Sequence, residues 1–210
     1  GMVKEGESRM APLTSLVSSG GFCYVGVDYR LLAFGWDGRD VIEDGQAALR
    51  WIVANADEFG FDTQAVFTYG ESGGGWPALM TAYHGFKDRR QLGVRILGVF
   101  TFSPQPDPLW SWQHERDSDR LWSHEMYTYS ELCSRTTSSR VADLKPLNAT
   151  DCEWLSAPAA AEGVATLTVV GSSDEAYGST TTSRFHQILT EKNISNAGYS
   201  LEAQNGTQPS

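Results

Sequence analysis

The chain has 210 residues, of which 40% are hydrophobic and 20% charged, so it is long enough to bury a core and too apolar to be disordered. Its net charge of −10 argues against the basic surface that binds nucleic acid or an anionic membrane, and no apolar run approaches the ~20 residues of a membrane span. We expect a single domain over residues 1–210 and no nucleic-acid partner.

The first part of the chain alternates between candidate helices and strands. Residues 11–20 predict a short helix that ends at a double glycine. Residues 22–29 form a nearly continuous apolar run, which is typical of a strand buried on both faces of a parallel sheet. Residues 40–58 predict an amphipathic helix with Asp40 as its N-cap. Its apolar stripe comprises Val41, Ala48, Trp51, Ile52 and Ala56.

The same alternation continues to the end of the chain, with one interruption. Strands are expected at 65–69, 95–102, 165–171 and 199–203, with helices from the turn after residue 69 to about residue 86 and over 179–192. Alternating strands and helices imply a three-layer α/β sandwich with a mostly parallel sheet and helices on both faces.

Residues 104–161 interrupt this pattern. They begin with three closely spaced prolines and contain four of the seven tryptophans among charged and polar residues. We expect an irregular, partly helical insertion. It is either an amphipathic flap whose aromatic side chains pack onto the main body, or a cap or lid whose aromatic side chains line a substrate pocket.

The turn Gly70-Glu71-Ser72-Gly73-Gly74 places a serine between a predicted strand and a predicted helix. A turn this tight holds the serine in a strained backbone conformation, and glycines on either side give the neighbouring segments room to pass. The hydroxyl is then held beyond the end of the sheet, and the N–H of Gly73 is aimed at an incoming oxyanion. The pattern predicts a nucleophile elbow; the alternative is a glycine-rich turn with an incidental serine.

A serine hydroxyl reacts only when a base removes its proton and a third group orients that base. In open α/β sheets, sites gather beyond the carboxyl ends of the strands, so the third group should follow a strand downstream of the elbow. Asp174 does so, and Glu175 is a nearby substitute. The alternative role for Asp174 is a helix N-cap or a turn residue.

Three stretches carry a family resemblance. Residues 27–31 (VDYRL) match a D-Y-R-L strand end, residues 47–52 and 59–62 match a helix that precedes a nucleophile strand, and residues 69–74 match a G-[DE]-S-[AG]-G-G elbow. In these stretches the chain resembles the α/β-hydrolase superfamily, and within it the carboxylesterase and hormone-sensitive-lipase-like branch. The match is best over residues 22–86 and looser over 165–203.

The resemblance implies an α/β-hydrolase fold and ester hydrolysis through an acyl-enzyme. It implies that Ser72 is the nucleophile, Asp174 the triad acid and the Gly73 N–H one oxyanion donor, with Gly70, Glu71 and Gly74 completing the elbow. No cofactor is implied, and no histidine spacing typical of a metal site is present.

Two features depart from the family pattern. Only residues 2–10 precede the first predicted helix, and they contain neither the branch's H-G-G-G oxyanion loop nor the usual first strands. The family histidine should follow the last strand, yet residues 204–210 contain none. We therefore expect a chain truncated at both ends relative to the family. The four histidines, His84, His114, His124 and His186, are each interpreted as surface or packing residues, although a flap could deliver His114 or His124 to Ser72.

The leading hypothesis is a serine hydrolase that cleaves a small carboxylic ester. The alternatives are a catalytically inactive α/β-hydrolase-fold binding protein, a gene fragment that borrows its missing strands by forming a homodimer, and, among enzymes, an amide or peptide hydrolase. The N-terminus lacks the apolar core of a signal peptide, so we expect a soluble, cytoplasmic protein. Free thiols are then the default for Cys133 and Cys152, which would pair only in an oxidising compartment, and Cys23 is expected to be buried in its strand.

Overall fold

The computed structural model describes residues 17, 19–30, 38–83, 91–106, 163–172 and 179–201. The predicted lid beyond residue 106, Asp174 and the histidines other than His186 lie outside the described residues. In the part described, no helix is long and apolar enough to cross a membrane.

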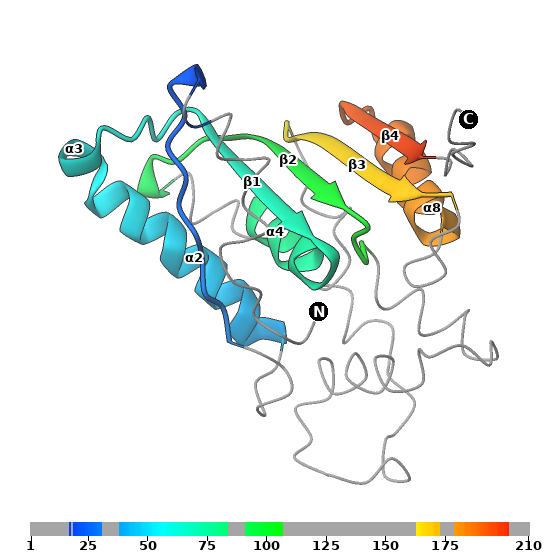
Figure 1. The fold of residues 1–210 in the computed structure, drawn as a ribbon, viewed down its shortest axis with the longest axis horizontal. Coiled ribbons are helices and arrows are strands. Elements are labelled where there is room, and N and C mark those ends of the chain that lie inside the picture. The colour runs from blue at the N-terminus through cyan, green and yellow to red at the C-terminus, as the bar shows by residue number, and fades with distance from the viewer. Residues whose placement is uncertain are drawn as a thin grey trace, which may run out of the picture.

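Four parallel strands form one sheet in the order β1 (Val66–Glu71), β2 (Ile96–Phe102), β3 (Ala165–Gly171) and β4 (Asn196–Leu201) (Figure 1). Strands that follow one another in sequence are neighbours in space, and the segments that connect parallel strands must cross over the sheet. The register pairs Glu71 with Phe102, Phe102 with Val169 and Thr166 with Asn196. The parallel sheet predicted from the sequence is confirmed, although β4 begins three residues earlier than expected.

The described helices are α2 (Gly38–Ala54), the short α3 (Ala56–Phe59), α4 (Gly75–Tyr83) and α8 (Ser179–Glu191). Helix α4 packs on β1, β2 and α2, and α8 packs on β3 and β4. Two predictions about the helix at residues 40–58 are wrong. Because α2 begins at Gly38, Asp40 lies in its first turn rather than at the N-cap, and Trp51 is 45% exposed rather than part of the buried stripe.

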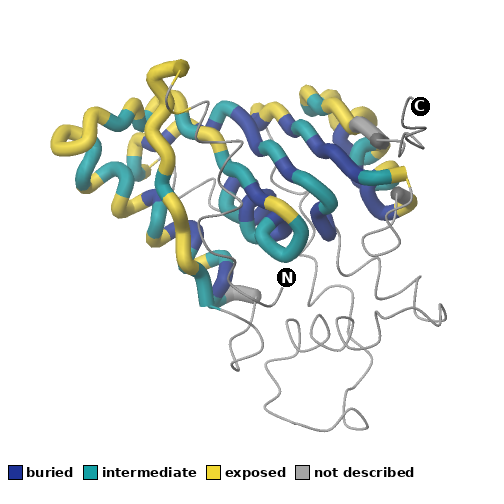
Figure 2. Tube along the Cα trace, viewed as in Figure 1, coloured by how far each residue is buried: buried dark blue, intermediate teal, exposed yellow. Residues whose placement is uncertain are grey.

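The largest correction concerns residues 22–29, which were expected to form a buried strand. They run as an extended segment beside β1, but they belong to no strand and most of them are exposed (Figure 2). A groove of about 500 Å³ separates this segment from β1, so its apolar side chains border the groove rather than a neighbouring strand. Cys23, expected to be buried, is an exposed free thiol for the same reason.

The core gathers around α4 and α8. Leu79, Met80 and Tyr83 of α4 and Phe185 and Leu189 of α8 are fully buried. The Tyr83 hydroxyl forms a buried hydrogen bond with the Thr166 hydroxyl on β3, so α4 is fixed to the sheet by a polar contact as well as by packing. The helix that follows the Ser72 turn is therefore anchored at its far end in the centre of the molecule.

Candidate active site

Ser72 lies at the sharp turn between β1 and α4. Glu71, the last residue of β1, is extended, with φ −122° and ψ 139°, whereas Ser72 has a positive φ of 52°. A 3-10 turn over Ser72–Gly74 follows, and the Gly75 N–H donates a hydrogen bond to the Ser72 carbonyl oxygen. A non-glycine residue at positive φ is uncommon and is favoured where the surrounding structure holds it in place. The chain therefore turns at Ser72, whose backbone is strained and whose side chain carries a hydroxyl.

Two glycines make this turn possible, and one of them was not singled out from the sequence. A Cβ at Gly70 would lie 2.6 Å from the carbonyl carbon of Gly74 and 2.9 Å from the Cβ of Ala78. A Cβ at Gly75 would lie 2.8 Å from the Cβ of Pro104. By contrast, no atom of the other described residues lies closer than 4.0 Å to a Cβ at Gly74. Gly70 and Gly75 are required by close packing, whereas the space around Gly74 would admit a side chain.

A second serine at positive φ lies beside the first. Since Phe102 pairs with Glu71, Ser103 follows β2 at the same end of the sheet at which Ser72 follows β1. Ser103 has φ 42°, and its N–H donates to the Val169 carbonyl oxygen at 2.8 Å. The sequence analysis treated the proline after Ser103 only as a break in regular structure. The Ser-Pro pair directly after a buried strand was the available signal for this turn.

Gly73 and Glu71 of the predicted elbow both lie at the described turn. Gly73 is part of the 3-10 turn and is half-buried, and Glu71 is exposed. Burial, followed by the charge of Glu71 and by Tyr24, raises the pKa of Tyr69 on β1. Tyr69 is therefore a neutral phenol at neutral pH and is no base for Ser72. Within the described ranges, no three histidine, cysteine or acidic side chains come together in a possible metal site.

His186 lies away from Ser72. Its Nδ1 is 2.9 Å from Oδ1 of Asn196, which pairs with Thr166 near the amino-terminal ends of β3 and β4. Ser72 lies beyond the carboxyl end of β1 in the same parallel sheet, so the two residues are at opposite ends of the strands. His186 also packs against Gly198, as its interpretation as a packing residue predicts.

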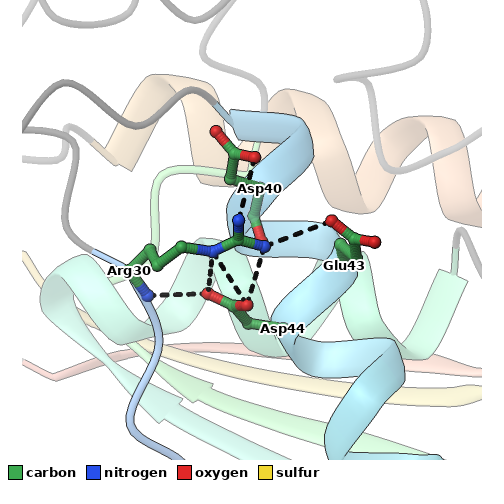
Figure 3. A network of polar contacts seen from close by, with 4 residues as sticks. All are labelled: Arg30, Asp40, Glu43 and Asp44. Atoms are coloured by element: carbon green, nitrogen blue, oxygen red, sulfur yellow. Dashed lines mark hydrogen bonds and ion pairs between the residues drawn. The ribbon is translucent and has the colours of Figure 1, made fainter.

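The D-Y-R-L stretch fastens the extended segment to α2 (Figure 3). The Arg30 backbone N–H donates to Oδ2 of Asp44 at 2.7 Å, and its Nε is 3.0 Å from both carboxylate oxygens. The Arg30 guanidinium also contacts Oδ1 of Asp40 at 3.1 Å and Oε2 of Glu43 at 3.2 Å. Burial alone would raise the pKa of Asp44, but the hydrogen bonds from Arg30 and its charge outweigh burial and lower that pKa.

This cluster has a consequence for the turn at Ser72. The hydroxyl of Tyr29, the residue before Arg30, is the atom that lies 4.0 Å from a Cβ built at Gly74. By holding Arg30 on α2, the cluster keeps Tyr29 next to the elbow. The sequence predicted this stretch as the end of a strand; in the structure it is a side-chain tether instead.

Known proteins share the sequence pattern or the fold of this chain. Residues 2–104 match the family model described as BD-FAE. None of the curated proteins matches the sequence. Among solved structures, a bacterial heroin esterase matches with a TM-score of 0.68 and 19% identity, over 95% of this chain and 62% of its own.

Two further esterases show the same fold. Carboxyl esterase 2 from the mycorrhizal fungus Tuber melanosporum matches with a TM-score of 0.67 and 17% identity, over 97% of this chain and 65% of its own. Esterase B from Lactobacillus rhamnosis matches with a TM-score of 0.62 and 20% identity, over 85% of this chain and 54% of its own. The chain spans little more than half the length of esterase B.

Proposed function

We propose that this chain belongs to the α/β-hydrolase superfamily and is a serine hydrolase that cleaves a small carboxylic ester through an acyl-enzyme on Ser72. One observation carries the proposal: Ser72 has a φ of 52° between a parallel strand and a helix anchored in the core. Such a turn presents a serine hydroxyl at the end of the sheet, where an ester carbonyl can approach it. The esterases with the same fold support the reaction class.

In the proposed reaction, the Ser72 Oγ attacks the ester carbonyl carbon and the alcohol leaves. Water then releases the acid from the acyl-enzyme. The N–H of Gly73 donates to the oxyanion, and Asp174 orients the base. The base that takes the Ser72 proton has two candidates, His114 and His124, which lie in the predicted lid; His84 follows Tyr83, at the end of α4 that is far from Ser72.

A fluorophosphonate probe tests the nucleophile directly, because it reacts only with a serine whose proton is removed by a base. We expect an adduct on Ser72 in the wild type and none in Ser72→Ala. Ser103→Ala is the matched control, since Ser103 is also a serine at positive φ that follows a neighbouring strand. Equal labelling of wild type and Ser72→Ala would refute the proposal.

The same probe identifies the base. Removing one triad member leaves only ~10³–10⁴-fold catalysis over water, so the correct His→Ala change should abolish measurable labelling. We expect either His114→Ala or His124→Ala to do so. His186→Ala should label like the wild type, because His186 lies at the other end of the strands.

Two competing functions predict other outcomes. A catalytically inactive binding protein is favoured by the distance of the described histidine, His186, from Ser72. It predicts no adduct on a folded wild-type chain and ligand binding that survives Ser72→Ala. An amide or peptide hydrolase predicts labelling, together with faster turnover of a p-nitroanilide than of the matching p-nitrophenyl ester.

Three expectations from the sequence stay predictions. They are the single domain with a lid over residues 104–161, the cytoplasmic location and the homodimer. Limited proteolysis tests the first, because a lid should be cleaved before the sheet and its helices are.

A further inference from the structure

The groove beside β1 has the shape and surroundings of a place for a strand. One wall is the extended segment 21–29, and the other is the edge of β1 at residues 65–69. Its remaining lining comes largely from α2 and α4, the helices that pack beside the sheet at this edge. A groove with an extended segment on each side and helices beneath it is what a layered α/β fold leaves when a strand position is empty.

The backbone at this groove is ready for strand addition. Among the described strands, β1 is at the end of the sheet and pairs with β2 alone, so its other edge faces the groove. An edge strand presents a row of N–H and C=O groups on which a further strand can pair. Four residues of β1 and the residue before it line the groove, which suits a strand of ordinary length.

Apolar side chains concentrate on the same groove. The described residues include seven large apolar side chains that are exposed, and four of them line it: Phe22, Tyr24, Val27 and Phe67. Clustered exposed apolar surface marks a site of interaction rather than ordinary solvent-facing surface. Phe67, on β1, is the most exposed of the four at 57%.

The chain carries both the acceptor edge and a strand that would fit it. Residues 22–27 have the apolar, β-branched and aromatic composition of a strand, yet they belong to no strand in the structure. Each copy therefore offers an open edge on β1 and an extended apolar segment that is not in a sheet. Surfaces that complement themselves in this way are satisfied by a symmetric pair.

We propose that two copies of this chain pair by inserting the segment 22–27 of each into the groove of the other. The resulting order is β1 of one copy, the partner's segment, the first copy's segment and the partner's β1. A two-fold axis that runs along the strands keeps all four parallel and places the two α2 helices on opposite faces. Both grooves are filled at once, and a sheet of four strands becomes one continuous sheet across the dimer.

The first experiment measures molar mass by light scattering over a range of protein concentrations. We expect the wild type to reach twice the chain mass of 23.0 kDa. Phe67→Lys should raise the dimer dissociation constant at least ~10-fold, because it places a charge on the pairing edge. Phe59→Lys is the matched control, since Phe59 is 50% exposed but lies on α3 outside the groove lining, and its dissociation constant should stay near that of wild type.

The second experiment uses the exposed free thiol of Cys23, which lines the groove. In the proposed dimer each segment 22–27 lies between two strands, so the Cys23 thiol should react with a maleimide more slowly at protein concentrations that favour the dimer. Mass spectrometry should find slow alkylation of Cys23 in the wild type and faster alkylation in Phe67→Lys at the same concentration. Phe59→Lys should be alkylated at the wild-type rate.

Three results would overturn the proposal: a wild type that stays monomeric at every concentration, a dimer that Phe67→Lys and Phe59→Lys weaken equally, or a dimer in which Cys23 is alkylated as fast as in the monomer. A monomer whose groove binds a small apolar dye is the outcome for a ligand pocket and counts against strand exchange. Labelling of Ser72 does not bear on any of these readouts, so the dimer and the proposed reaction succeed or fail separately.

Discussion

Two apolar segments of this chain look alike in sequence and differ in structure. Residues 96–102 form β2, a central strand in which Val99 is 2% exposed. Residues 22–29 are as apolar, but they form no strand, and Val27 is 44% exposed. The difference lies in the neighbours. Strand β2 has a pairing partner on each side, whereas the segment 22–29 faces a groove. Apolar composition indicates that a segment can be a buried strand, and the neighbouring backbone decides whether it becomes one.

The test with the largest expected effect removes the same two methyl groups from one valine in each segment. Val99→Ala should lower the free energy of unfolding by about 2 kcal/mol, because it leaves a cavity in a packed core. Val27→Ala should change it by less than about 0.5 kcal/mol, because this side chain is largely in water. Chemical denaturation at low protein concentration measures both. Equal losses would mean that residues 22–29 are packed as tightly as β2.

A second test weakens the contact between Arg30 and Asp44, which fastens the extended segment to α2. Asp44→Asn should lower the melting temperature at pH 7, by less than Val99→Ala does, since it weakens the hydrogen bonds to Arg30. Hydrogen exchange of residues 22–30 should become faster in the variant, while that of β2 stays the same.

The pH dependence of this effect follows from the lowered pKa of Asp44. A carboxyl whose pKa is lower in the folded protein contributes stability above its ordinary pKa of 3.8 and loses it as the pH falls through the folded value. The difference between wild type and Asp44→Asn should therefore disappear in acid. Asp57→Asn, on the exposed surface of α3, is the control and should leave the melting temperature unchanged. A difference that persisted at pH 2 would assign the effect to packing rather than to charge.

The prediction with the smallest expected effect concerns β4, the last strand of the described sheet. Among the described strands, β4 lies at the other end of the sheet, where α8 packs on it and His186 packs against Gly198. Burial lowers the pKa of His186, and the hydrogen bond with Asn196 only partly opposes this. The unfolded chain therefore takes up a proton first as the pH falls below 6.5, and stability is lost in that range.

His186→Gln is the variant for this test. Compared with wild type, its melting temperature should fall less between pH 7 and the folded pKa of His186, because it has no group that titrates there. Differential scanning fluorimetry in a pH series measures the two slopes. Identical slopes would mean that His186 is solvated in the folded protein. The contact of His186 with β4 would then not be what stabilises this strand.

The sequence predicted the strands that pair with neighbouring strands and failed for residues 22–29, which belong to no strand. The runs at 95–102 and 165–171 correspond to β2 and β3, because a continuous apolar run suits a strand with neighbours on both sides. The run at 22–29 has the same signal, and nothing in it reports the groove. Helix α2 begins at Gly38, two residues before the predicted N-cap, and Asp40 forms an ion pair with Arg30.

The turn at Ser72 could be predicted from the sequence, but the packing around it could not. The glycine spacing around Ser72 predicted a tight turn between a strand and a helix, and these two elements are present. The required glycine at Gly75 was missed because its constraint comes from Pro104, which lies 29 positions further along the chain. Contacts between residues so far apart in sequence leave no local pattern. Asp174 stays a prediction that lies outside the described residues.

The backbone conformation of Ser72 also bears on redesign. An L-residue at positive φ costs roughly 1–2 kcal/mol relative to a relaxed backbone, and glycine avoids most of this cost. Any consensus or computational procedure that optimises stability alone would thus replace Ser72, at φ 52°, among its first changes, and Ser103, at φ 42°, soon after. An engineer who wants a hardier version of this chain should fix both serines before searching, and should look for stability in positions such as Gly74, where a side chain has room.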